Sequence, residues 1–184
     1  MCDEPSLGVQ VRLVDEKNND VESGKEGEII AQSDSIMVEY RRKPEEMREA
    51  IIDGWLHTGD MAYYDKKGFI YIVDRKKDKI VTGGENVYSR EVEDVLYRHS
   101  AIADVAVIGI PDPEWVERVY AVVVLKETAS ATENEIMAFC KGHVASYKAF
   151  KSVDFTASLP KNPQGKILKR KLMEKYRAGR EQPK

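Results

Sequence analysis

A lysine-rich stretch near the end of the chain holds the first candidate for chemistry. Residues 159–172 read LPKNPQGKILKRKL, with five cations and no acidic residue, although the 184-residue chain has a formal net charge of −3. Lys166 follows Gly165 where a last helix, 166–177, is predicted to begin. A flexible glycine and a reaching ammonium group at a helix start suit a phosphate or carboxylate. The alternative is that Lys166 is a common surface cation on a solvated helix face.

Asp60, in the segment HTGD, is the second candidate. A carboxylate offers two acceptor oxygens, which can bind the two adjacent hydroxyls of a ribose at once. The alternative is a turn aspartate that accepts hydrogen bonds from its own backbone. For the neighbouring His57 and Thr58 we expect structural roles alone.

Gly83 and Gly84 interrupt the strand-like run IVTGGENVY. Glycines inside a strand often mark a bulge or the close approach of a ligand or another backbone segment. The pair lacks the spacing of a dinucleotide-binding or P-loop motif. A plain bulge is therefore the alternative to a binding role for the two glycines. For the charged segment RKKDK at 75–79, the alternative to a functional role is a solvated linker.

Composition narrows the class of protein. The longest apolar runs fall far short of the eighteen or so residues of a membrane span, and the first ten residues show no signal-peptide features. Cys2 and Cys140 form no metal-ligand or redox spacing. A sequence pI near 5.7 argues against a general nucleic-acid binder. We expect a cytoplasmic protein without metal ligands.

The elements that position these residues change in character along the chain. The first part is predicted to be mainly strand, and the second part is predicted to mix strands and helices as a compact α+β unit. Ser89 is a candidate helix cap, and Thr132 with Glu135 has capping-box spacing. The predicted hairpins are 9–15 with 26–32 and 61–74; the predicted helices are 43–52, 89–100, 132–144 and 166–177; the other predicted strands are 103–110, 118–126 and 152–159; residues 53–60 are predicted to form a loop.

Three segments in order resemble successive motifs of the adenylate-forming superfamily of acyl-CoA synthetases, luciferases and peptide-synthetase adenylation domains. They are DGWLHTGD (53–60), GFIYIVDRKKDKIVTGGENVYSREVED (68–94) and LPKNPQGKILKRKL (159–172). The first two are most similar to bacterial medium- and long-chain fatty-acyl-CoA ligases.

The resemblance implies an α+β fold and two domains. Residues 1–76 would be the β-rich C-terminal remnant of a large N-terminal domain, and 77–184 the mobile C-terminal domain. Members of the family activate a carboxylic acid with ATP to an acyl-adenylate and pyrophosphate, then transfer the acyl group to the thiol of CoA. ATP and CoA are therefore the implied cofactors. Mg²⁺ is expected in the full-length enzyme but not on this chain.

The resemblance also assigns roles to residues. Asp60 would hold the ribose hydroxyls, Arg75 would contact the ribose and adjoining phosphate, and Lys166 would bridge the substrate carboxylate and the α-phosphate. An ammonium group there offsets charge that accumulates in the transition state. Lys77 would be the hinge about which the small domain swings between the two half-reactions.

After that swing, the segment 82–85 would replace Lys166 at the active site and line the pantetheine tunnel. Its residues are Thr82, Gly83, Gly84 and Glu85. Lys148 is assigned to the nucleotide phosphates of CoA. Ser89 stands where many relatives have proline, a change expected to alter helix entry more than chemistry.

We therefore expect the C-terminal fragment of an ATP-dependent acyl-CoA ligase, with a fatty acid as the favoured substrate and the large N-terminal domain as partner. The isolated chain is expected to be inactive, because the phosphate loop, adenine pocket and acyl pocket of the family have no counterpart in it. A long-chain substrate would favour peripheral membrane contact. Two alternatives are open: an aryl-acid-CoA ligase or other adenylating enzyme, and a stand-alone module whose basic helix binds nucleic acid or an acidic partner.

Overall fold

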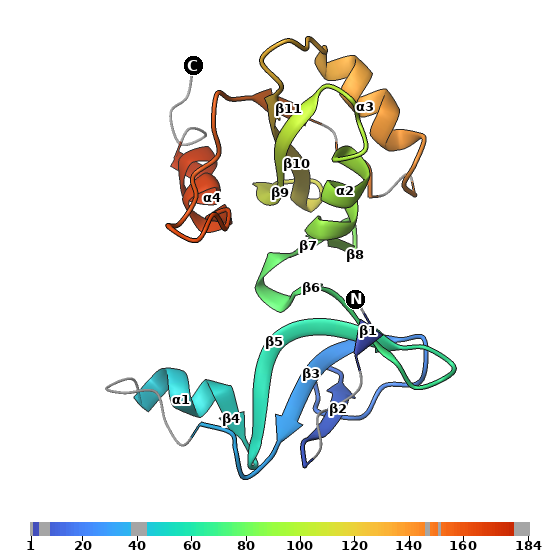
Figure 1. The fold of residues 1–184 in the computed structure, drawn as a ribbon, viewed down its shortest axis with the longest axis vertical. Coiled ribbons are helices and arrows are strands. Elements are labelled where there is room, and N and C mark those ends of the chain that lie inside the picture. Colours follow the sequence, from blue (N-terminus) through green and yellow to red (C-terminus); the bar gives the residue numbers. More distant parts are fainter. Residues whose placement is uncertain (1, 4–7, 38–43, 146–147, 151, 179–184) are drawn as a thin grey trace. The chain divides into compact units, whose positions relative to one another are not determined.

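The computed structural model describes residues 2–3, 8–37, 44–145, 148–150 and 152–178. The chain divides into two compact units, Met1–Lys77 and Asp78–Lys184 (Figure 1). This division lies one residue after the boundary expected from the sequence. Each unit has its own sheet, and the expected α+β class is confirmed. None of the described helices is long and apolar enough to cross a membrane.

Unit 1 is an antiparallel sheet in the order β1-β6-β5-β3-β2, with β4 also paired to β5. Leu13, Ala62 and Ile70 form its buried core. The elements are β1 (Cys2–Asp3), β2 (Gln10–Val14), β3 (Glu26–Gln32), α1 (Pro44–Ala50), β4 (Ile51–Ile52), β5 (Trp55–Tyr64) and β6 (Ile70–Arg75).

Both hairpins predicted for unit 1 are confirmed. Strand β2 pairs with β3, and β5 pairs with β6. The second turn is held by Asp65, whose Oδ1 accepts hydrogen bonds from the N–H groups of Lys67 and Phe69, and Gly68 supplies a φ of +87°. The helix begins at Pro44, a favoured first-turn position. It ends at Ala50 because the next two residues pair with β5.

The loop predicted for 53–60 is wrong. Asp53 and Gly54 make a tight turn with positive φ, and strand β5 begins at Trp55. Opposite β3 the register shifts between Glu28, which pairs with Met61, and Ile30, which pairs with His57. Strand β5 absorbs the extra residues as a bulge around Gly59, whose φ is +71°. Asp60 thus lies on a bulged strand.

Unit 2 is built on a second sheet, in the order β11-β10-β7-β8, with β9 paired along β10. Among the described strands of this sheet, β11 alone is parallel to its neighbour, and α3 lies in the crossover between β10 and β11. Its elements are β7 (Lys79–Thr82), β8 (Glu85–Tyr88), α2 (Ser89–Leu96), β9 (Ile102–Asp112), β10 (Val116–Leu125), α3 (Glu133–Lys141), β11 (Ser152–Phe155) and α4 (Lys169–Ala178). The short 3-10 helix η1 (Lys76–Asp78) precedes β7.

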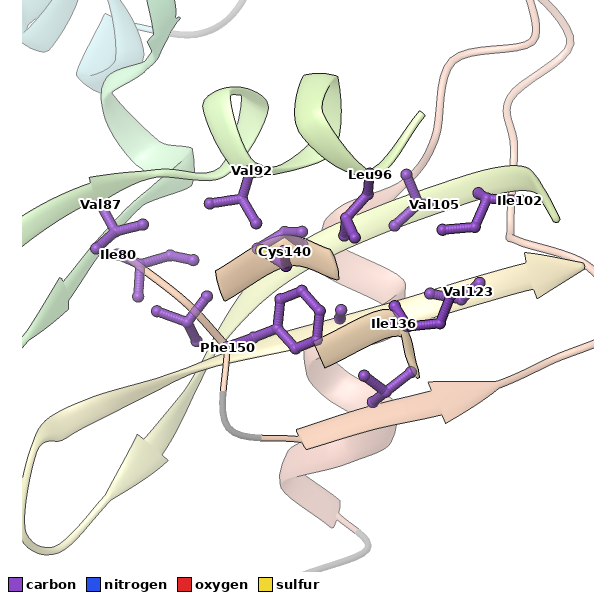
Figure 2. Close-up of a cluster of buried hydrophobic side chains, with 14 residues drawn as sticks. Ile80, Val87, Val92, Leu96, Ile102, Val105, Val123, Ile136, Cys140 and Phe150 are labelled. Carbon is purple, nitrogen blue, oxygen red and sulfur yellow. The ribbon is translucent and has the colours of Figure 1, made fainter. Parts of the chain in front are cut away.

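The β9–β10 hairpin packs against a different cluster of side chains on each face. Successive side chains of a strand point to opposite sides, so each strand contributes to both clusters. Val105, Val107 and Val123 pack with Ile136 and Phe150 in the cluster that α2 and α3 cover (Figure 2). Ala106, Ile108, Ile110 and Val122 pack instead with Leu159 and Leu172, under α4. Helix α4 is therefore fixed to the sheet by its own core.

Helix α3 confirms its predicted start, since Thr132 and Glu135 form a complete capping box. The predicted cap at Ser89 is wrong: Tyr88 is the N-cap of α2, and Ser89 is a fully buried first helical residue. Helix α2 also ends at Leu96, four residues before the predicted end. The predicted start of the last helix at Lys166 is wrong as well, because α4 begins at Lys169.

Candidate functional site

Asp60 and Arg75 face each other on the adjacent strands β5 and β6. Arg75 Nε lies 2.8 Å from Asp60 Oδ1, and its Nη1 donates to the carbonyl of Thr58 at 3.3 Å. The Asp60 side chain remains 26% exposed. The pair therefore presents an oriented, partly accessible carboxylate beside a guanidinium group, which suits a ligand with hydroxyls and a phosphate.

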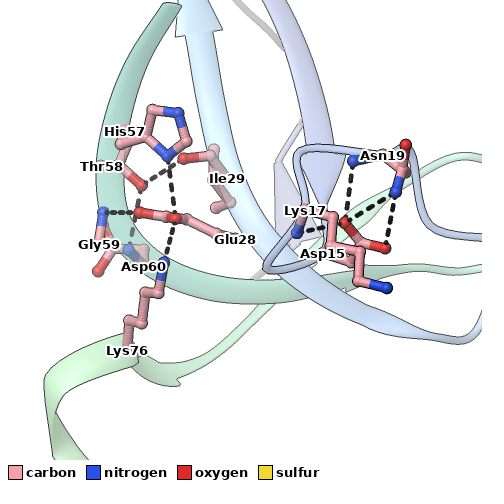
Figure 3. A network of polar contacts seen from close by, with 10 residues as sticks. All are labelled: Asp15, Lys17, Asn19, Glu28, Ile29, His57, Thr58, Gly59, Asp60 and Lys76. Carbon is pink, nitrogen blue, oxygen red and sulfur yellow. Dashed lines mark hydrogen bonds and ion pairs between the residues drawn. The ribbon is translucent and has the colours of Figure 1, made fainter. Parts of the chain in front are cut away.

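A buried carboxylate, Glu28, organises the bulge that carries Asp60 (Figure 3). Its Oε1 accepts the N–H of Gly59 at 3.1 Å. Its Oε2 lies 3.0 Å from His57 Nδ1 and 2.8 Å from Lys76 Nζ. Because the Glu28 side chain is only 7% exposed, one carboxylate connects β3, the bulge of β5 and the start of η1.

Thr58 completes the fixation of Asp60. Its hydroxyl donates to the carbonyl of Ile29 at 2.8 Å and accepts the N–H of Asp60 at 3.1 Å. The backbone on both sides of Gly59 is therefore bonded to β3, directly or through a side chain.

The Glu28 carboxylate is stabilised in its charged form. Burial alone would raise its pKa, but the hydrogen bonds from Lys76 and His57 outweigh burial and hold the pKa below its usual value. A charged Glu28 can accept from all three donors at once.

Sequence reasoning missed Glu28 and gave His57 and Lys76 no role in a site. The available signal was the alternation of β3, in which Glu28 lies two residues from Ile30 on one face. Ile30 is 2% exposed, so a carboxylate on its face must be paired. The partners could not be identified, because they arise from the unpredicted bulge and from η1.

Lys166 lies in a tight turn in front of α4. Asn162 Oδ1 accepts the N–H groups of Gln164 and Lys166 at 3.1 and 2.8 Å. The Gly165 N–H donates to the Asn162 carbonyl, the Asn162 N–H donates to the Lys166 carbonyl, and both distances are 2.9 Å. Gly165 adopts a φ of +82°, which glycine accepts without steric cost. The backbone of Lys166 is thus fixed while its side chain is exposed.

The cations around Lys166 are mostly neutralised within the unit. Lys161 pairs with Asp104, Lys169 pairs with Glu93, and Arg170 pairs with Glu174. Within the described part of the chain, no side chain pairs with the ammonium group of Lys166 or Lys171. The exposed ammonium group of Lys166, with no partner among the described residues, therefore suits an anion.

The segment 82–85 forms the hairpin turn between β7 and β8, with Thr82 paired to Glu85. Gly83 and Gly84 have φ values of +59° and +85°, as the two central residues of a type I′ turn require. The bulge considered above is wrong. A Cβ on Gly83 would lie 2.8 Å from the ring of Trp115, so glycine is required there for a second reason.

The other assigned residues lie as follows. Lys148 Nζ is 2.7 Å from Glu91 Oε2 and its side chain is 19% exposed, so it is not a free cation. Lys77 is exposed in η1, at the end of unit 1. Asp60 and Arg75 belong to unit 1, whereas Lys148 and Lys166 belong to unit 2. Among the described residues, no group of three or more His, Cys, Asp or Glu side chains could hold a metal ion.

Comparisons with known proteins agree with the motifs. Residues 91–166 match the family described as the AMP-binding enzyme C-terminal domain. A long-chain-fatty-acid–CoA ligase of Bacillus subtilis is 50% identical over 148 residues, which are 80% of this chain and 26% of that protein. A feruloyl-CoA synthase of an Amycolatopsis species is 41% identical over 172 residues, which are 94% of this chain and 35% of that protein.

The fold is also similar to that of solved enzymes. The crystal structure of ATP-bound MatB from Rhodopseudomonas palustris superimposes with a TM-score of 0.86 at 34% identity, over 92% of this chain and 34% of that one. The chain thus spans about a quarter to a third of the length of the relatives it matches. From the three motifs, the matched domain and the shared fold, the chain belongs to the adenylate-forming enzymes, whose C-terminal domain it contains.

Proposed function

We propose that the protein carrying this chain is an ATP-dependent acid–thiol ligase that makes acyl-CoA, with a fatty acid as its acid substrate. The observation that carries this proposal is the exposed Lys166, without a partner among the described residues, on a turn held by the Asn162 side chain and by backbone hydrogen bonds. The 50% identity to a long-chain-fatty-acid–CoA ligase favours a fatty acid.

In the proposed first half-reaction a carboxylate oxygen of the acid attacks the α-phosphorus of ATP. The bond to the bridging oxygen breaks, and pyrophosphate leaves with the electron pair. Both reactants are anionic, so a positioned ammonium group stabilises the charge that accumulates between them. Lys166 would supply it, and Mg²⁺ would be held outside this chain.

Asp60 and Arg75 would hold the nucleotide in that step. Asp60 fits the adjacent hydroxyls of a ribose, because Arg75 orients Oδ1 of Asp60 while the Asp60 side chain stays accessible. The guanidinium group of Arg75, itself 44% exposed, would face the ribose and the adjoining phosphate. The Glu28 network would keep this pair in place.

In the proposed second half-reaction the thiol sulfur of CoA attacks the acyl carbon and the thiol proton passes to solvent. The bond between the acyl carbon and the phosphate oxygen breaks, and AMP leaves with that oxygen and the electron pair. The unit carrying Lys166 would rotate at Lys77, so that the turn Thr82–Glu85 lines the path of the pantetheine arm. Two glycines without side chains suit such a path. Lys148 would meet CoA phosphates only by leaving Glu91.

An aryl acid is the second candidate substrate, since the feruloyl-CoA synthase is 41% identical over almost the whole chain. A binding module that uses the basic helix is less well supported, because Lys161, Lys169 and Arg170 are already paired with carboxylates. The proposed location is the cytoplasm, with peripheral membrane contact for a long-chain substrate.

The deciding experiment measures both half-reactions of the parent-length protein with Lys166→Ala, wild type and Lys171→Ala. Losing one charge-stabilising donor costs roughly 10²–10³-fold in rate. We expect that loss in adenylation with fatty or aryl acids, but not in transfer from preformed acyl-adenylate to CoA. Lys171→Ala is the matched control, as an exposed cation without a described partner. Equal rates for Lys166→Ala and wild type would refute the role of Lys166.

The 184-residue chain by itself is expected to be inactive. ATP–pyrophosphate exchange by this chain alone would contradict that expectation and would place the whole adenylation site within it.

A further inference from the structure

The two lysines that flank the Lys166 turn are both bound to carboxylates far away in the sequence. Before the turn, Lys161 Nζ lies 2.6 Å from Asp104 Oδ2, at the start of β9. After the turn, Lys169 Nζ lies 2.8 Å from Glu93 Oε1, on α2. The lysine at the turn thus has no partner in the described part of the chain, whereas the lysine on each side of it is paired with a carboxylate.

The Lys169 contact is the more enclosed of the two. The side chains of Lys169 and Glu93 are both 13% exposed, and Lys169 also donates to the hydroxyl of Ser89 at 2.5 Å. Glu93 is itself fixed, because it accepts the N–H of Val107 at 2.7 Å. A charge pair that is shielded from water and bonded on both sides holds its geometry better than an exposed pair.

The Lys161 contact is reinforced in a similar way. Asp104 also accepts the hydroxyl of Tyr97 at 2.6 Å. Burial would raise the pKa of Asp104, but the hydrogen bonds from Lys161 and Tyr97 outweigh burial and lower it. The carboxylate is therefore charged at neutral pH and attracts Lys161.

Between these two contacts the turn is closed by its own backbone. Lys161 and Ile167 form an antiparallel bridge, and the Leu168 N–H donates to the Pro160 carbonyl at 2.8 Å. Ile167 also packs against the cluster under α4. A shift of Lys169 or Lys161 would therefore move the whole turn, including Lys166.

We propose that Lys169 and Lys161 are positioning residues, which fix the turn so that Lys166 reaches the reacting phosphate from one defined place. This inference rests on the proposed role of Lys166. Lys169 has the larger share, because its contact is less exposed and joins α4 to α2. We assign no positioning role to the other two cations of the stretch, because Arg170 pairs within its own helix and Lys171 has no described partner.

The first test measures the half-reactions of the parent-length protein with Lys169→Met, which keeps the apolar stem and removes the charge. Displacing a reacting group by about 1 Å can cost on the order of 10²-fold, and we expect adenylation to slow about tenfold or more. The KM for ATP and the rate of thioester transfer should stay unchanged. Lys171→Met is the control for the loss of one positive charge near Lys166.

Glu93→Gln provides a second route to the same contact. It removes the charge from the other partner, retains the side-chain length, and leaves an oxygen for the Val107 N–H. It is therefore informative even if Lys169→Met folds poorly. We expect the same selective loss of adenylation with a smaller magnitude, and recovery of part of the rate in Lys169→Arg relative to Lys169→Met.

The second test is independent of activity. Amide hydrogen exchange of the 184-residue chain should show faster exchange at Gly165 and Lys166 in Lys169→Met than in wild type. Amides of β10, such as that of Val122, should be unchanged, as should all of these amides in Lys171→Met.

The outcomes separate this inference from the proposed function. If Lys166→Ala leaves adenylation intact, the proposed function fails. If Lys166→Ala abolishes adenylation but Lys169→Met matches Lys171→Met in rate and exchange, only the positioning role is overturned. Equal slowing of both half-reactions, with faster exchange in β10, would also overturn it, because Lys169 would then be merely structural.

Discussion

The regions around Asp60 and Lys166 hold their key side chains in opposite ways. Asp60 is paired with Arg75, its N–H donates to the Thr58 hydroxyl, and the N–H of the preceding Gly59 donates to the buried Glu28. Lys166 has a fixed backbone but an exposed ammonium group with no partner among the described residues. In the first region the side chain proposed to bind ribose is itself held, and in the second only the turn that carries the proposed lysine is held.

The difference fits the two tasks proposed for these residues. A carboxylate that binds the two hydroxyls of a ribose must present its oxygens in one orientation, so a neighbouring guanidinium group helps it. A lysine that must meet phosphate in one state of the enzyme and leave in another would be hindered by a carboxylate partner of its own. The carboxylates nearby are instead bound by Lys161 and Lys169.

Removing the centre of the first region should have the largest effect on stability. Glu28→Ala leaves His57, Lys76 and the Gly59 N–H without their shared acceptor. We expect it to lower the free energy of unfolding of unit 1 by about 2–4 kcal/mol, because donors lose a buried partner and a cavity forms. Urea unfolding monitored by unit 1 resonances would measure it. The exposed pair of Glu22 and Lys25 gives the control, since Glu22→Ala should produce no measurable change.

The same carboxylate predicts a pH dependence confined to the first region. The pKa of Glu28 is lower in the folded chain than the ordinary value of 4.5. Its stabilising contribution is therefore complete above about pH 4.5 and is lost as the pH falls through the folded-state pKa. The free energies of unfolding of wild type and Glu28→Gln should therefore converge as the pH falls over that range. Parallel curves down to low pH would show that Glu28 is not charged in the folded state.

A matched pair of glycines compares the two regions at the backbone. Gly59 and Gly165 have φ values of +71° and +82°, and both have open space where a Cβ would stand. Alanine at either position should cost about 1 kcal/mol through backbone strain alone. The functional effects should differ: Gly59→Ala should raise the KM for ATP, and Gly165→Ala should lower the adenylation rate at unchanged KM. The same kinetic change in both variants would contradict the separation of roles.

The sequence predicted the elements whose pattern is local. The hairpins of unit 1, the capping box of Thr132 and the β9–β10 pair rest on alternation, turn residues and a side chain three residues away. The motifs predicted Asp60, Arg75 and Lys166 as site residues, and these roles stay predictions. The structure places the three residues at a bulge, on the facing strand and in a turn.

The errors arose where distant segments decide the structure. The segment 53–60 looked like a loop because Gly54 and Gly59 interrupt it, but pairing with β3 and β6 makes most of it a strand. Lys166 looked like a helix start, yet its carbonyl accepts the N–H of Asn162 and the next residue, Ile167, forms a bridge with Lys161, so the helix begins only at Lys169. Ser89 looked like a cap, but it lies in the core beside Lys169, 80 residues later.

The pairing of β1 with β6 bears on the order in which unit 1 can assemble during synthesis. Cys2 lies opposite Tyr71 and Asp3 lies opposite Ile70, so a strand that is made early within unit 1 has a partner that is made last within the unit. The β2–β3 hairpin can form early from neighbouring residues. The edge strand β1 must wait until β6 has emerged, and by then η1 and the first strand of unit 2 follow directly behind it.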